Sequence, residues 1–419
     1  MIGFLVMSIY QLVDVFFVSQ YVGKIAIAAI NIVLPITFLI SSIGMAIGVG
    51  GASIISRALG AGDHNKAFKT FSNQLKLTTG LSLIFVLVGY IFTGPVLRIF
   101  GSNAEILPMA KEYFHILLIG IPFLAWAMMS NNVIRAEGKP KIAMLTLVIP
   151  AVANIILDPI LIYYLDMGIA GAAWATTIGY GCSGLYTLWF FLRGKSEIKV
   201  IKPKNFLDMD IVKEMSSIGS VTLVRQGSFS LLAIVLNNSL DHYGGSLAIA
   251  MYGLIRGFTM FIAFPNIGIM QGLMPIVGFN YGAEKYSRLR QALKLGITWT
   301  TSISVLLFAI ITYFSNDVIS FFTDDADLIA YTPRAMIITF AGLPTMGLSF
   351  IAAAYFQAIG KTRPALFLTL ARQGLFMIPL ALVLPLFMDL DGIWFAMPIG
   401  EILATIVSAI FLYKAVKKF

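Results

Sequence analysis

Charged residues are scarce in this sequence of 419 residues. Asp, Glu, Lys and Arg make up 12% of it, whereas soluble globular domains carry about 25%. In their place, 58% of the residues are hydrophobic, and the mean hydropathy is +0.89. This balance excludes a soluble globular domain and predicts a polytopic membrane protein.

Residues that carry redox, metal and hydrolytic chemistry are also few. The single cysteine, Cys182, cannot form an intramolecular disulfide, and His64, His115 and His242 are scattered without the spacing of metal ligands. No Ser-His-Asp or Cys-His set falls on one face. We therefore expect that the protein is not an enzyme and holds neither zinc nor a cofactor.

A cleavable signal sequence is missing, because no basic region precedes the first apolar segment. That segment is short at its start, and we expect the native chain to begin upstream of Met1. Apolar runs follow throughout the chain, each with the roughly 20 residues that span about 30 Å of hydrocarbon. They predict twelve helices, at residues 1–20, 26–56, 72–97, 108–134, 142–164, 168–192, 211–240, 246–278, 292–315, 331–359, 364–387 and 392–415.

Basic residues are concentrated on one side of this predicted topology. The loops after the second, fourth, sixth, eighth and tenth helices and the C-terminal tail hold most of the 29 Lys and Arg residues, whereas the opposite side holds only Lys24, Arg98, Lys111 and Arg334. By the positive-inside rule, both termini are cytoplasmic. The net charge of +9 is therefore a topology signal, and we expect no nucleic-acid partner.

The two halves of the chain resemble each other at a constant offset of 222 residues. At this offset Gly23 meets Gly245, and the sequence AEGK at 136–139 meets AIGK at 358–361. Because each half has six helices, both halves enter the membrane from the same side. Parallel repeats of this kind are typical of transporters whose halves are related by an axis along the membrane normal.

The predicted fold is therefore an all-α polytopic membrane protein with two six-helix lobes, related by a pseudo-two-fold axis along the membrane normal. We assign residues 1–192 to the N-terminal lobe, residues 193–210 to a cytoplasmic linker and residues 211–419 to the C-terminal lobe.

Few polar side chains lie at depth in the predicted helices. Asn154 and Asp158 are four residues apart in PAVANIILDPILIYY (150–164), so both project from one helix face. An ionisable group there costs roughly 3 kcal/mol or more, and it marks an ion or substrate path. Pro150 and Pro159 bend the helix and leave backbone carbonyls free near Asp158. The stretch is suited to hold a small cation.

The other deep acid of the first half is Asp14. At the offset of 222, Asp14 and Asp158 meet Leu236 and Leu380, so the acidic pair belongs to one lobe only. This favours a functional role over a polar contact between helices. Two carboxylates in a dry site can bind Na⁺ or share a proton, and the sequence leaves both open.

Two threonines of the sixth predicted helix are candidates to complete this site. Asn154 adds a neutral oxygen, and Thr176 can add a hydroxyl. Its neighbour Thr177 points about 100° around the helix, so only one of the two can face the site.

Four deep charges occupy the second half. In one interpretation the arginines neutralise the glutamate and cap free carbonyls as a structural network, and in the other they serve substrate or proton transfer. The four residues are Arg225, Arg256, Arg372 and Glu401.

Motifs that are specific in combination run along essentially the whole chain. They are YQLVDVFFVSQYVG, GVGGASIISRALGAGD, IRAEGKPKIAM, NIILDPILI and GIAGAAWATTIG in the first half, and GFNYGAEK, YFQAIGKTRPA and GIWFAMPIGE in the second. These segments resemble the multidrug and toxin extrusion (MATE) transporters, particularly the bacterial DinF-like and MepA-like branch.

The resemblance implies export of organic cations, drugs and other amphipathic toxins across the inner membrane of a prokaryote, driven by Na⁺ or H⁺ through alternating access. It implies a cation site at Asp14, Asn154, Asp158 and Thr176. We expect a monomer whose partners are small amphipathic substrates and the lipid bilayer. The alternative is a flippase or exporter of a lipid-linked or metabolic substrate.

Overall fold

The structure is a computed structural model that describes residues 6, 17–18, 20–194, 196–199, 207–323 and 325–417, without the side chains of Lys24, Met260 and Phe261. The regular elements in these ranges are all helical. Asp14 and most of the first predicted span lie outside the described residues.

Helices cover both halves of the described chain. The first half holds α2 (Lys24–Gly60), α3 (His64–Ile91), α4 (Thr93–Ile99), α5 (Leu107–Ala136), α6 (Pro140–Asp158), the π-helix η1 (Pro159–Tyr164) and α7 (Gly168–Leu192). The second half holds α8 (Met209–Gly282), α9 (Tyr286–Tyr313), α10 (Ser315–Phe322), α11 (Ala326–Phe340), α12 (Leu343–Ala358), α13 (Thr362–Leu370), the π-helix η2 (Ala371–Met377), α14 (Ile378–Val383) and α15 (Pro385–Val416).

Within the described residues, eight helices are long and apolar enough to cross a membrane, and nine if α11 and α12, which meet at 43°, form one broken span. Helix α8 has 74 residues and contains two predicted spans, divided at Gly245 with φ +61°. The eleventh predicted span is shared by α13, η2 and α14. Each predicted span from the second onward thus corresponds to helical structure.

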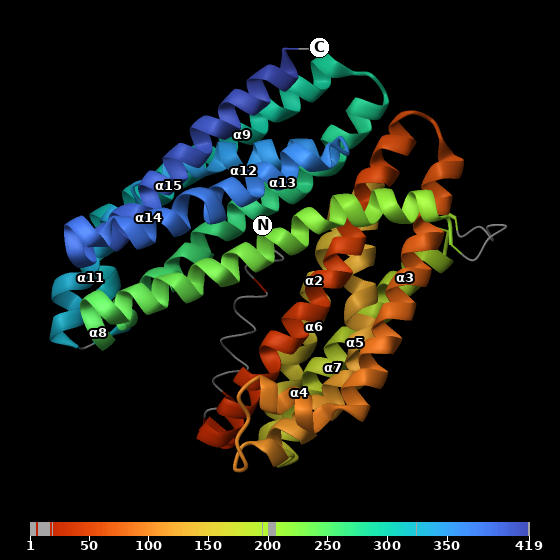
Figure 1. Ribbon diagram of the computed structural model, residues 1–419. Coiled ribbons are helices and arrows are strands. Elements are labelled where there is room, and N and C mark those ends of the chain that lie inside the picture. The colour runs from red at the N-terminus through yellow and green to blue at the C-terminus, as the bar shows by residue number, and fades with distance from the viewer. Residues whose placement is uncertain are drawn as a thin grey trace. The chain divides into compact units, whose positions relative to one another are not determined.

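The chain forms two compact units, one of residues 2–222 and one that contains residues 223–419. In the first unit α2 packs against α3 and α5, and α7 packs against α5 and α6 (Figure 1). Its core includes the fully buried Val33, Leu118 and Ala172. In the second unit α12 packs against α9 and α15.

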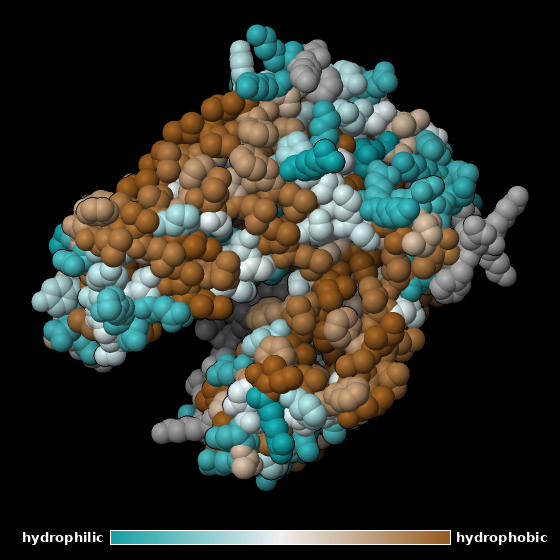
Figure 2. Space-filling model, in the orientation of Figure 1, coloured by the Kyte–Doolittle hydropathy of each residue, from teal (hydrophilic) through white to brown (hydrophobic). Residues whose placement is uncertain are grey.

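The surface of each unit is apolar along the middle of its helices and hydrophilic toward their ends (Figure 2). Large hydrophobic side chains of these helices are exposed, such as Leu87 of α3 at 60% and Leu306 of α9 at 59%. A contiguous apolar surface of this kind is a liability in water but is matched by the hydrocarbon of a bilayer.

The repeat recognised in the sequence recurs in the backbone. Gly23 and Gly245, which meet at the offset of 222, have φ values of +103° and +61°, and Gly138 and Gly360 have +76° and +77°. Positive φ is strained for residues with a Cβ, so glycine is favoured where two helices are joined by such a turn.

Two further turns match although one of them has glycine in the first half only and the other has glycine in neither half. Gly62 and Glu284 have φ values of +76° and +56°, and Asp166 and Asp389 both have +48° at an offset of 223. Four of the turns with positive φ therefore recur in both halves.

One helix crossing is preserved with its side chains exchanged. A Cβ on Gly51 of α2 would lie 2.1 Å from Gln74 of α3, and a Cβ on Gly296 of α9 would lie 2.9 Å from Leu273 of α8. Gly51 and Gln74 meet Leu273 and Gly296 at the offset of 222. Each crossing pairs one small and one large residue, which keeps the packing dense.

The first turns of α8 belong to the first unit. A Cβ on Gly50 would lie 2.2 Å from the carbonyl oxygen of Met215, so α2 and α8 are in backbone contact. Glu214 of α8 forms ion pairs with Arg57 (2.9 Å) and Lys66 (3.2 Å). This docking explains why the units divide within α8, whereas the lobe and linker boundaries given above stay a prediction.

Candidate cation site and buried ionic network

Asn154 and Asp158 lie on α6, which ends at Asp158. Pro159 follows, and since it has no N–H to continue the α-helical ladder, the chain widens into η1. Pi-helical segments of this kind are frequent at functional sites. Asn154 is 2% exposed and Asp158 is completely buried. Both polar side chains therefore lie in the interior of the unit, one helical turn apart.

The structure separates the two candidate threonines. The Asn154 side-chain amide donates a hydrogen bond to the Thr176 hydroxyl at 3.2 Å. The Thr177 hydroxyl donates instead to the backbone carbonyl of Ile116 in α5, at 3.1 Å. Thr176 therefore lies with Asn154, and Thr177 ties α7 to α5.

The oxygen atoms at this place suit a small hard cation. The Asn154 amide nitrogen is used on Thr176, and the Asn154 side-chain oxygen accepts no hydrogen bond from the described residues. An ionised Asp158 carboxylate is an acceptor only. Carboxylate, amide and hydroxyl oxygens are ligands preferred by hard cations, and the carboxylate can alternatively take a proton. Asp14, the fourth predicted member, lies outside the described residues.

In the second half, Arg372 and Glu401 form one ionic network. The Arg372 Nε donates to the Glu401 carboxylate at 2.8 Å, and the Ser349 hydroxyl donates to its other oxygen at 2.9 Å. The Arg372 guanidinium lies 4.4 Å from the centre of the Phe350 ring. Glu401 is 4% exposed. Its charge is balanced inside the unit, as a buried carboxylate requires.

The other two predicted arginines are arranged differently. Arg225 is half-buried, and its Nη2 donates to the Gln357 side-chain oxygen at 3.2 Å. Arg256 is exposed, and no ion pair joins it to another residue in the described ranges. Sequence reasoning did not find Ser349, Phe350 or Gln357, because serine, phenylalanine and glutamine in apolar helices carry no distinctive signal.

The network occupies a place that the repeat makes recognisable. At the offset of 222, Arg372 and Glu401 meet Pro150 and Gly179. A Cβ on Gly179 would lie 3.0 Å from the Pro150 carbonyl oxygen, so those two residues are also in contact. The same helix contact is a close backbone approach in one half and an ion pair in the other.

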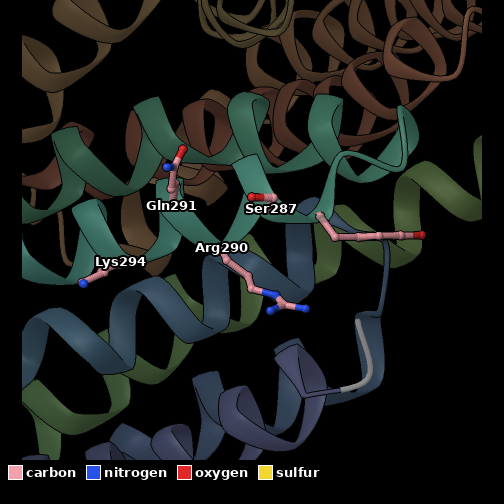
Figure 3. Close-up of a pocket in the computed structure, with 5 residues that line it drawn as sticks. Ser287, Arg290, Gln291 and Lys294 are labelled. Atoms are coloured by element: carbon pink, nitrogen blue, oxygen red, sulfur yellow. The ribbon is translucent and has the colours of Figure 1, made fainter.

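A surface pocket lies apart from both polar sets, at the start of α9 (Figure 3). It has a volume of about 430 Å³. The residues that line it lie on consecutive turns of one helix and are Tyr286, Ser287, Arg290, Gln291 and Lys294.

Apolar spans, two repeated helical halves and polar groups buried within them define a multi-pass membrane transporter. The MatE family model matches residues 1–160 and 222–383. The chain therefore belongs to the MatE family of transporters, as its sequence motifs predicted.

Known relatives cover nearly the whole chain. Multidrug export protein MepA of Staphylococcus aureus (strain MSSA476) is 28% identical over 417 residues, 99% of this chain and 91% of MepA. The outward-facing structure of a multidrug resistance MATE family transporter of the MOP superfamily has a TM-score of 0.93 at 26% identity, over 100% of this chain and 94% of that one.

A second solved structure, of the MATE multidrug transporter DinF-BH, is 37% identical with a TM-score of 0.89, over 98% of this chain and 92% of that one. These matches confirm the predicted fold, an all-α membrane protein with twelve spanning helices in two lobes.

Proposed function

We propose that this transporter is an antiporter that exports drugs and other amphipathic toxins in exchange for Na⁺ or H⁺. The observation that carries the proposal is the buried pair of Asn154 and Asp158, with the half-buried Thr176 bonded to Asn154, in one half only. The substrate class is supported by the names of the relatives, MepA being a multidrug export protein and DinF-BH a multidrug transporter.

In the proposed mechanism, Asp158 takes up the cation, Asn154 and Thr176 supply neutral oxygens, and Asp14 completes the site. Neutralising a buried carboxylate removes the cost of its desolvation. The free energy released can shift the transporter only if the cation binds one arrangement of the halves more tightly than the other. The turn from α6 into η1 beside Asp158 supports a conformational response there, because the helix is already interrupted at Pro159.

Export into proteoliposomes with Na⁺ and pH gradients imposed separately tests the proposal. Asp158→Asn should abolish gradient-driven export while leaving the folded protein intact. Asp391→Asn is the control, because Asp391 pairs with the exposed Arg334 at 2.7 Å. Gradient-driven export that survives in Asp158→Asn would refute the assignment, and the gradient that drives the wild type identifies the ion.

A second candidate, a flippase or exporter of an anionic lipid-linked or metabolic substrate, is favoured by one observation. Arg225 is half-buried and forms no ion pair with a described residue. If the substrate is anionic, Arg225→Gln should reduce transport more than Asp158→Asn. The opposite order supports the antiporter.

We also propose a monomer in the inner membrane of a prokaryote with both termini cytoplasmic. The basic loops support this orientation. Cysteines introduced at Ser287 and Asp391 should be labelled from opposite sides of the membrane, and labelling of both from one side would contradict the topology. Light scattering of the purified protein at one protomer mass would support the monomer.

A further inference from the structure

The pocket at the start of α9 is lined by cations and uncharged hydrogen-bonding groups, with no acidic residue. Figure 3 shows the charged ends of Arg290 and Lys294 on one side of the helix and Ser287 and Gln291 on the other. The pocket therefore has a cationic edge suited to a phosphate and a neutral edge suited to hydroxyl groups.

The neutral edge continues into an apolar stripe. Ser287, Gln291, Leu295 and Trp299 follow one another at intervals of four residues, so their side chains lie on one face of α9. Leu295 is 59% exposed and Trp299 is 61% exposed. Tryptophan is enriched where lipid head groups meet hydrocarbon. One helix face thus offers polar contacts first and then the exposed apolar surface of Leu295 and Trp299, as a phospholipid presents a polar head group and then its acyl chains.

An additional polar group lies nearby. Tyr355 of α12 is 1% exposed, and its hydroxyl has no hydrogen-bond partner in the described part of the chain. It is close enough to Tyr286, a pocket residue, for the two hydroxyls to interact electrostatically.

The repeat shows that this polar face is not a general consequence of the fold. At the offset of 222, Arg290 meets Phe68 and Lys294 meets Ser72. In the first half Phe68 packs against a cluster that contains Ile198, from the segment between the halves, and Ser72 is 2% exposed. The same helix face is covered by the protein's own chain in α3 and carries two exposed cations in α9.

We propose that the start of α9 is a binding site for an anionic phospholipid of the phosphatidylglycerol class. Arg290 and Lys294 contact the phosphate, Ser287 and Gln291 contact the head-group hydroxyls, and an acyl chain lies along Leu295 and Trp299. The site goes beyond the transport activity and does not depend on which cation drives it.

The experiment uses two double variants that remove the same charge from the same end of α9. Arg290→Gln with Lys294→Gln neutralises the pocket, and Lys285→Gln with Arg288→Gln neutralises two exposed cations outside its lining. Native mass spectrometry of the detergent-purified full chain, with equimolar phosphatidylglycerol and phosphatidylcholine, gives the preference for the anionic lipid. A basic residue in contact with the anionic head group contributes about a fivefold preference, whereas one outside the site contributes less because its charge is screened by salt.

We expect the pocket variant to lower the phosphatidylglycerol preference about tenfold or more and the control variant to change it less than about threefold. Equal losses in both variants would mean a diffuse basic surface and would overturn the site, as would an unchanged preference in the pocket variant. Soluble glycerol phosphate should compete weakly, because it lacks the acyl chain. Competition as strong as that of the lipid would overturn the proposed ligand and leave a phosphate site.

A second readout places the acyl chain. The fluorescence of Trp299 is the part of the signal that is lost in Trp299→Phe. Phosphatidylglycerol with brominated chains should quench this fluorescence more strongly than brominated phosphatidylcholine does. That difference should vanish in the pocket variant. Equal quenching by the two lipids would contradict a chain held along α9.

Discussion

The two halves of this transporter share their backbone and differ in their buried charges. Turns with positive φ recur at one offset, as at Gly138 and Gly360. The position of Asp158 is Leu380 in the second half, whereas the ion pair of Arg372 and Glu401 has no charged counterpart in the first. Several turns thus have the same backbone geometry in both halves, whereas the buried polar groups differ. One half carries the candidate coupling site, and the other carries a balanced network suited to hold helices together.

Removal of one acid from each half tests this difference most directly. Asp158→Asn should abolish gradient-driven export with little change in melting temperature. Glu401→Gln should destabilise the protein by about 2 kcal/mol, because it leaves the half-buried Arg372 charge without its carboxylate. Export assays in proteoliposomes and thermal unfolding in detergent, made on both variants, separate the two roles.

The control replaces the whole pair. Arg372→Met together with Glu401→Leu should restore most of the lost stability, since an apolar pair of similar volume often matches a buried ion pair. The Ser349 hydroxyl, freed from Glu401, can then donate to the Met346 carbonyl at 2.9 Å instead. If the double variant is as unstable as Glu401→Gln, the network stabilises the protein by more than the neutralisation of the Arg372 charge. If it is stable but does not transport, Arg372 has a role in transport.

Two equivalent glycines give a comparison of packing. Gly50→Ala should destabilise the protein by about 1–3 kcal/mol, because its Cβ would meet the Met215 carbonyl oxygen at 2.2 Å. Its repeat partner Gly272 has open space, so Gly272→Ala should stabilise α8 by about 0.5–1 kcal/mol. Thermal unfolding of the two variants checks this, and equal effects would show that the docking of α8 on α2 is not as close as the structure indicates.

Neighbouring threonines sharpen the difference between coupling and packing. Thr176→Val should weaken the response to the coupling cation about tenfold, because it removes the hydroxyl beside Asn154. Thr177→Val should instead lower stability by about 1 kcal/mol through the lost bond to Ile116. Thr176→Val should therefore change the cation dependence of export, and Thr177→Val should change the melting temperature. The interpretation fails if Thr177→Val alters the cation dependence more.

The smallest expected effect concerns the segment that covers α3. Burial raises the pKa of Glu137, although Ser196 and Lys139 donate hydrogen bonds to its carboxylate. A raised folded-state pKa means that the folded protein holds this proton more tightly than the unfolded chain does. The resulting stability is present below the ordinary carboxyl pKa and is lost as the pH rises through the raised value.

Hydrogen exchange at Glu197 and Ile198 checks this expectation. After correction for the intrinsic exchange rate, protection of these amides should fall with rising pH in the wild type. In Glu137→Gln that fall should disappear, and in Glu197→Gln, which removes an exposed carboxylate, it should persist. A pH dependence that survives in Glu137→Gln would assign the effect to another group.

Much of the fold could be predicted because the relevant signals are local or periodic. Apolar runs gave the spans from the second onward, and the shared glycines gave the repeat. The spacing of Asn154 and Asp158 gave one face of one helix. The partner of Glu401 could not be chosen among three arginines, since each lies in an apolar helix and only packing decides which guanidinium comes within 2.8 Å.

Hydropathy, the internal repeat and helical spacing were enough to establish that this protein crosses a membrane, that it is a duplicated transporter, and that Asn154 and Asp158 lie on one face of one helix. Only the folded structure shows that Thr176 and not Thr177 meets Asn154, and that Ile198 joins the apolar cluster of α3 whereas Arg290 and Lys294 of α9 are exposed. The physical reason is the same in both cases. Hydropathy and helical spacing act along the chain, whereas the rotation of one helix against another is set by the packing of side chains from distant segments.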